Sequence, residues 1–219
     1  LAGGVYAYQN GIFSDENVQN QNSVTVDDYK VRAVVNGEVV TQKEINDRLT
    51  DATPVLVQQG INIADPTVRM QIESQILDDT INYLVLKHAA TKSQTEISQE
   101  QVDEQYDAVV TQAGGEDLLQ AELSQSSITL EMFKERITEQ VLVNTYLEAN
   151  VPMTDIAVTE EELRNTYDSA IGSQPEGAEI PAFDEVQEII RQQLRSQKEQ
   201  ELITSYIATL RKDAEITIN

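Results

Sequence analysis

The sequence predicts a mainly α-helical protein, a multi-helix bundle with a small β-sheet formed by an N-terminal hairpin and a C-terminal strand. Two observations lead to this fold class. Apolar residues recur at steps of three and four along most of the chain, which is the spacing of helices that bury one face. Short β-prone runs lie near both ends, at residues 31–40 and 214–219. Because a two-stranded hairpin alone is marginal in water, we expect the last strand to pair with it.

The N-terminal hairpin is predicted from its turn. Val31 to Val35 and Glu38 to Val40 are β-prone runs separated by Asn36-Gly37, a pair that favours the positive φ angles of a tight hairpin turn. Thr41 follows with Glu44 three residues later, which is the capping-box pattern that opens a helix.

The later helices are predicted from their start and stop signals. The second helix begins at Asp65-Pro66 and carries an apolar stripe from Val68 to His88. Gly114-Gly115 ends the third, and the last runs for about 30 residues from Phe183. Capping residues mark three other starts: Ser98 with Gln101, Thr129, and Thr159 with Glu162.

Composition excludes several classes of function. The chain has 38 acidic and 15 basic residues, a net charge of -23, which repels phosphate backbones and anionic lipid headgroups. We therefore expect no nucleic-acid partner. The absence of cysteine excludes disulfides, thiolate metal sites and a cysteine nucleophile.

The N-terminal region is expected to be a flexible polar leader, residues 1–29, ahead of a domain spanning 30–219. Its first eight residues are small and apolar and do not begin with Met. They fit the stub of a removed signal or membrane anchor, and equally an ordinary frayed terminus. No apolar run reaches the roughly 18 residues of a membrane span.

Four segments together resemble the SurA and PrsA group of extracytoplasmic chaperones. They are residues 34–45 with the Asn-Gly turn, 76–85, 97–103, and the closing stretch 183–216. The resemblance covers about residues 31–219 and implies a SurA N-terminal-like helical domain. It also implies a place outside the cytoplasm, in the periplasm or on the outer face of the cell membrane, through a removed signal or anchor.

The sequence departs from that group at one point. Full-length relatives carry parvulin-type prolyl isomerase domains between the helix opened by Thr159 and the last long helix. Here that interval is a loop at residues 169–181, with no room for such a domain. The isomerase histidines have no counterpart, so we expect no isomerase activity.

Residues that could carry chemistry are few. His88 is the only histidine and ends an apolar stripe, which favours a structural role over a catalytic or metal-binding one. Adjacent acidic residues such as Asp78-Asp79 and Glu160 to Glu162 are expected by chance among 38. No phosphate loop, nucleophile elbow or His-Glu-x-x-His pattern occurs. We expect no catalytic residue, no metal and no cofactor, and hence no enzyme.

The resemblance implies an ATP-independent holdase that binds unfolded or exported polypeptides through apolar helix surfaces. Candidate peptide-binding residues are Met132, Phe133, Leu142, Tyr146 and Leu147, although the same stripe is also typical of core. The alternative is a structural or adaptor module of the cell envelope that binds one specific partner. Long terminal helices tied by an edge strand further predict that a domain-swapped homodimer is accessible.

Overall fold

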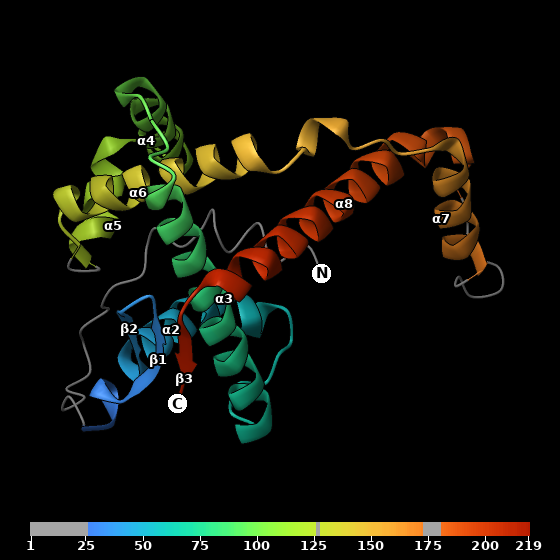
Figure 1. Ribbon diagram of the computed structural model, residues 1–219. Helices are drawn as coiled ribbons and strands as arrows, with labels where there is room; N and C mark the ends of the chain where they lie inside the picture. Colours follow the sequence, from blue (N-terminus) through green and yellow to red (C-terminus); the bar gives the residue numbers. More distant parts are fainter. Residues whose placement is uncertain (1–25, 126–127, 173–180) are drawn as a thin grey trace.

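The computed structural model describes residues 26–125, 128–172 and 181–219, and it confirms the predicted fold class (Figure 1). These ranges hold seven α-helices and one three-stranded sheet. The strands are β1 (Val31–Val35), β2 (Glu38–Thr41) and β3 (Ile216–Ile218). The helices are α2 (Gln42–Gln58), α3 (Pro66–Lys92), α4 (Gln99–Ala113), α5 (Glu116–Gln125), α6 (Leu130–Asn150), α7 (Glu160–Gly172) and α8 (Phe183–Asp213), with short 3-10 helices η2 (Val26–Tyr29) and η3 (Met153–Asp155).

The sheet joins the two ends of the described chain, as predicted. Its order is β2-β1-β3 with antiparallel pairs, so Ala33 lies opposite both Val40 and Ile218. Asn36 and Gly37 take φ angles of 48° and 89°, the left-handed values that the hairpin turn requires. The Asn36 side chain also accepts a hydrogen bond of 2.9 Å from the Glu215 amide, which holds β3 against the turn.

The predicted helix starts are confirmed by their hydrogen bonds. Thr41 with Glu44, and Ser98 with Gln101, form reciprocal capping boxes at the starts of α2 and α4. The Asp65 side chain accepts from the Thr67 amide at 2.8 Å, directly before the proline that begins α3. Each of these bonds satisfies backbone N–H groups that a helix leaves free at its first turn.

The core is divided among three packing clusters. One joins the inner face of the sheet, including Val35 and Val40, to α2 and the middle of α3. A second joins α4, α5 and the first half of α6 around Phe133 and Ile137. The third packs the end of α3 against the second half of α6 and the last turns of α8, around Leu86. Helix α3 therefore connects the sheet to the rest of the molecule.

Helix α7 and the first half of α8 form an arm that projects from this body (Figure 1). Leu163 is fully buried between them, and the Tyr167 and Phe183 rings meet edge to face with centroids 5.3 Å apart. Residues 173–182 connect the two helices, and 173–180 lie outside the described residues. The interval at which the resemblance implied a missing isomerase domain thus lies between the end of α7 and the start of α8. Residues 169–172, predicted as part of that loop, instead belong to the end of α7.

The predicted leader differs from the structure at its boundary. Residues 1–25 lie outside the described residues, so most of that prediction stays a prediction. Val26–Tyr29, which the prediction included in the leader, instead form the 3-10 helix η2 against α2. This short turn has no apolar period of its own, so the sequence alone did not indicate it.

Candidate functional site

The five predicted peptide-binding residues all lie on α6, but they do not form one surface. Phe133 is fully buried in the cluster with α4 and α5. Tyr146 and Leu147 are buried in the cluster with α3 and α8, and Leu142 packs partly buried against it. Only Met132 among the five is exposed. The three buried side chains do not line an open surface in this structure, and their role in peptide binding stays a prediction.

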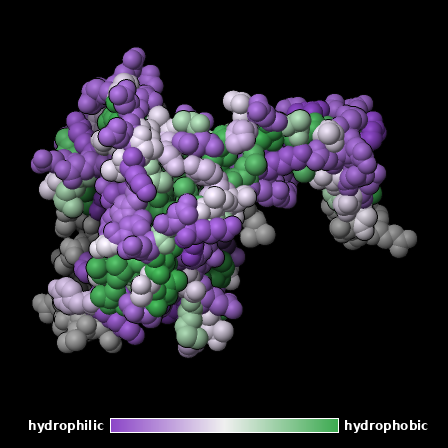
Figure 2. All heavy atoms as spheres, in the orientation of Figure 1, coloured by the Kyte–Doolittle hydropathy of each residue, from purple (hydrophilic) through white to green (hydrophobic). Residues whose placement is uncertain are grey.

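One exposed apolar surface that the sequence did not single out is the end of the α2–α3 hairpin. We call residues 54–72 the α2–α3 tip. Val57 is 57% exposed and Met70 62%, and Val55 is similarly exposed. No apolar side chain of the tip is fully buried; the partly exposed ones are Leu56, Ile61, Ile63, Val68 and Ile72. Figure 2 shows hydrophobic residues gathered over the sheet and α2, which belong to the same lobe as the tip.

The tip is exposed because the hairpin is longer than the core it packs on. Along α3 the first buried residue is Leu77, three turns after the helix begins at Pro66. On α2 the last buried residue is Leu49, and Pro54 follows it inside the helix. The apolar stripe of α3 therefore continues past the body of the protein, where solvent or a partner must cover it.

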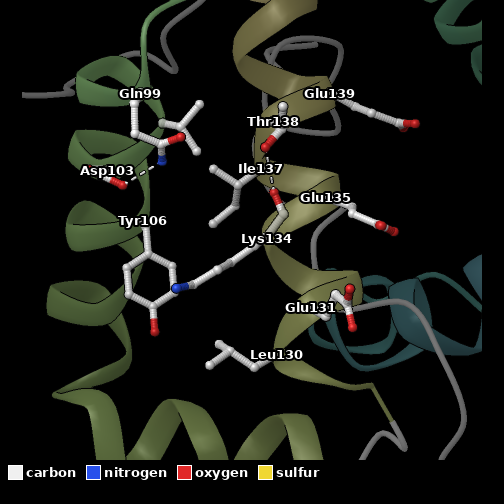
Figure 3. A pocket seen from close by; sticks show the side chains of 11 residues that line it. Gln99, Asp103, Tyr106, Leu130, Glu131, Lys134, Glu135, Ile137, Thr138 and Glu139 are labelled. Atoms are coloured by element: carbon white, nitrogen blue, oxygen red, sulfur yellow. Dashed lines mark hydrogen bonds between the residues drawn. The ribbon is translucent and has the colours of Figure 1, made fainter.

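A second surface is an open groove of about 850 Å³ between α4 and α6, which we call the α4–α6 groove (Figure 3). Its floor is apolar, formed by the buried side chains of Val102 and Ile137 with Leu130 beside them. Tyr106 points into it from α4 and Lys134 from α6, and the Lys134 Nζ lies 4.8 Å from the centre of the Tyr106 ring. The Tyr106 hydroxyl donates to Glu116 Oε1 at 2.6 Å, which fixes the ring.

Carboxylates surround this floor. Glu131, Glu135 and Glu139 follow one another every four residues along α6, on the flank turned away from α4 (Figure 3), and Asp103 lines the groove from α4. Asp103 accepts a hydrogen bond from Gln99 at 2.9 Å. Within the described residues, Glu131 and Glu135 have no ionic or hydrogen-bonding partner for their side chains. The groove lining therefore carries a net negative charge, with four acidic residues and one lysine.

A polar junction links the groove to the sheet. Lys87 of α3 lies 3.4 Å from Glu38 of β2 and 3.1 Å from Glu139 of α6, and Tyr83 donates to Glu139 at 3.0 Å. Burial by itself lowers the pKa of Lys87, but the hydrogen bond and charge of Glu139, followed by those of Glu38, leave that pKa above its usual value. Burial, then the Glu139 charge, raises the pKa of the Tyr83 hydroxyl. At neutral pH Lys87 therefore stays charged and the Tyr83 hydroxyl stays neutral.

His88 belongs to the same junction. Its Nε2 lies 3.0 Å from Glu38 Oε2, so it ties the end of α3 to strand β2. This contact fits the structural role predicted for it. Among the described residues, no group of three or more His, Asp or Glu side chains is placed to hold a metal ion. Nor does any helix in the described ranges combine the length and apolar character needed to cross a bilayer.

The predicted acidic runs are dispersed by the fold. Asp78 pairs with Arg211 of α8 at 2.8 Å, and Glu160 pairs with Arg164 at 3.1 Å within α7. Burial raises the pKa of the neighbouring Asp79, and the Gln75 hydrogen bond opposes that rise. Asp78 thus bonds across to α8, whereas Asp79 and Glu160 bond within their own helices.

Sequence reasoning missed both surfaces for different reasons. For the tip a signal existed: the run Pro54-Val55-Leu56-Val57 borders a loop rather than a helix centre, where apolar residues seldom reach the core. For the groove no local signal existed, because its two walls come from separate helices. Periodicity shows that Val102 and Ile137 face inward, but not that a hollow remains above them.

Comparison with known proteins identifies one family. The family model described as the SurA-like N-terminal domain matches residues 10–147, well over half of the chain. The matched residues take in β1, β2, helices α2 to α5 and most of α6, and so contain both the tip and the groove. No curated protein matches the chain.

Proposed function

Because the chain belongs to the SurA-like N-terminal domain family, which relates it to chaperones, we propose that it is an ATP-independent holdase. It binds unfolded or exported polypeptides by shallow apolar contacts and does not catalyse prolyl isomerisation or any other reaction. The observation that carries the proposal is the α2–α3 tip, an apolar surface kept out of the core on an otherwise strongly acidic chain.

The energetics of such a surface suit a holdase. Covering one exposed Val or Met side chain contributes roughly 1.5–3 kcal/mol, so a few contacts give weak, reversible binding. Apolar contacts are also non-directional, which allows many client sequences. The net charge of -23 keeps the loaded complexes apart from one another and in solution.

The location of the protein is part of the same proposal. Its family relationship favours action outside the cytoplasm, where exported chains arrive unfolded and ATP is not at hand. Residues 1–8 are mostly small and apolar, a composition compatible with a position near a membrane. Their structure lies outside the described residues.

The test compares two double variants that each replace two apolar side chains of similar fractional exposure. Val57→Ser/Met70→Ser changes the tip, where the two side chains are 57% and 62% exposed. Leu118→Ser/Ile189→Ser is the control, on α5 and α8, with exposures of 55% and 65%. We expect the intact chain and the control to suppress aggregation of a denatured client of near-neutral charge at equimolar ratio, and the tip variant to lose most of that effect in light scattering.

Three outcomes would oppose the proposal. An intact chain that leaves client scattering unchanged is not a holdase. A single tight partner captured without any general effect on aggregation favours the adaptor alternative. Equal losses in the tip and control variants would mean that the tip is not the client surface.

A further inference from the structure

The α4–α6 groove presents an apolar floor beside unpaired negative charge. Val102 and Ile137 are buried at its base, and Tyr106 forms one wall. Its volume, about 850 Å³, lies in the range of roughly 300–1,000 Å³ that is usual for small-ligand pockets. It can therefore hold a few side chains of a longer segment rather than a folded domain.

The charges of the groove point to a cation. Lys87 and Tyr83 already satisfy Glu139, but Glu131 and Glu135 have no partner among the described residues. The two stand one helical turn apart on the same flank of α6, where a ligand spanning the groove could meet both. Unpaired carboxylates beside an apolar floor favour a ligand that supplies both Lys or Arg and apolar side chains.

Lys134 shows how such a cation can be received. Its ammonium group lies 4.8 Å above the centre of the Tyr106 ring, a cation–π arrangement made by the protein with its own side chain. The lysine thus stands in for a ligand cation on the exposed face of the ring. A Lys or Arg of a bound segment would take that place on Tyr106 and displace Lys134 toward solvent.

From these observations we infer that the α4–α6 groove binds short basic, amphipathic segments of client polypeptides. This inference rests on the proposed holdase function and narrows its substrate class. The apolar side chains of the segment enter between α4 and α6, and its Lys or Arg side chains reach over α6 to Glu131 and Glu135. The net charge of -23 draws such segments in, so their binding weakens as salt rises.

The experiment uses the full chain and three fluorescein-labelled peptides with the same leucines in an amphipathic pattern. In the first the charged positions are Lys, in the second Gln, and in the third Glu. Binding is followed by fluorescence anisotropy at low and at physiological salt. We expect the Lys peptide to bind at least tenfold more tightly than the Glu peptide, with the Gln peptide between them.

Two variants with the same change in net charge then locate the site. Glu131→Gln/Glu135→Gln removes the unpaired acids of the groove, and Glu148→Gln/Glu161→Gln removes two exposed glutamates elsewhere. The groove variant should bind the Lys peptide about threefold to tenfold more weakly, and the control should bind it nearly as the intact chain does. Lys134→Met should strengthen binding of the Lys peptide, because it frees the Tyr106 ring.

Each opposing result has its own meaning. Equal losses in the groove and control variants would overturn the inference by assigning the effect to overall charge. Weaker binding by Lys134→Met would overturn the role of Tyr106. A dimer in light scattering that the groove variant converts to a monomer would assign the groove to a second copy of the chain instead. The holdase assay uses a near-neutral client that is proposed to bind at the tip. If the groove does not bind basic peptides, the protein should still suppress aggregation of that client, so the two proposals can fail separately.

Discussion

At the scale of single residues, Glu162 connects helix α7 to helix α8. It closes the capping box of α7 with Thr159, whose amide donates to Glu162 Oε2 at 2.8 Å. Its other oxygen lies 2.6 Å from Lys198 Nζ on α8. The Lys198 hydrogen bond, followed by those from Thr159, lowers the pKa of Glu162 to about 2.

Because the pKa of Glu162 is lowered, we expect the docking of α7 on α8 to depend on pH. Because the folded pKa lies below the usual value, the stabilisation is present above about pH 4.5 and is lost as the pH falls toward 2. Lys198→Met should raise the pKa of Glu162 toward its usual value in a carbon NMR titration. Arg195→Met, one turn away and paired with Glu199, should leave it low. A pKa still near 2 in Lys198→Met would contradict the prediction.

Half of this site could be predicted from the sequence. Thr159 and Glu162 lie three residues apart, so the capping box follows from local spacing. Lys198 lies 36 positions further along the chain, and nothing near it indicates which carboxylate it meets. The same holds for His88. Its position near the end of α3 could be predicted from local spacing, but its partner Glu38 could not, because that contact depends on how the sheet packs on α3.

At the scale of elements, the α7–α8 arm should open separately from the body. Leu163 is fully buried, α7 packs against α8, and Leu163 belongs to none of the three packing clusters of the body. Leu163→Ala removes a buried side chain at a typical cost of about 2–5 kcal/mol, enough to undock a small element. Amide hydrogen exchange should therefore speed up along α7 while the middle of α3 keeps its protection.

Ile81→Ala provides the comparison, because Ile81 is equally buried but packs against the sheet from α3. That variant should lower the protection of α3 and of the strands together. If Leu163→Ala reduced protection in α3 as strongly as Ile81→Ala, the arm and the body would form one cooperative unit, contrary to this prediction.

The existence of most elements follows from the sequence, whereas their burial does not. The stripe from Val68 to His88 predicts α3 as one long helix, and the structure confirms it. Periodicity gives no information on where the neighbouring elements end, so Val68 and Ile72 were indistinguishable from Leu84. Their exposure depends on the lengths of α2 and of the sheet, which only the packed molecule defines.

At the scale of the whole molecule, strand β3 closes the fold. The Asn36 amide donates to the Glu215 carbonyl at 2.8 Å, and the Asn219 amide donates to the Arg32 carbonyl at 2.9 Å. In the last turn of α8, Arg211 bonds Asp78 at 2.8 Å and also Asn82, both of which lie on α3. The last residues of the chain thus fix the sheet, α3 and α8 to one another.

Removing residues 214–219 should consequently destabilise the helical body and not only the sheet. Each lost β1–β3 hydrogen bond costs about 0.5–1.5 kcal/mol, and the apolar contacts of Ile216 with the sheet cluster are lost with them. The helical circular-dichroism signal should unfold at a clearly lower denaturant concentration. Ile218→Ser, which changes an exposed side chain and keeps the backbone pairs, should shift the midpoint little. An unchanged midpoint after truncation would mean that α3 and α8 hold together without the strand.

A swapped homodimer would have to exchange this same strand, so the truncated chain should also lose any dimer that light scattering detects in the intact one.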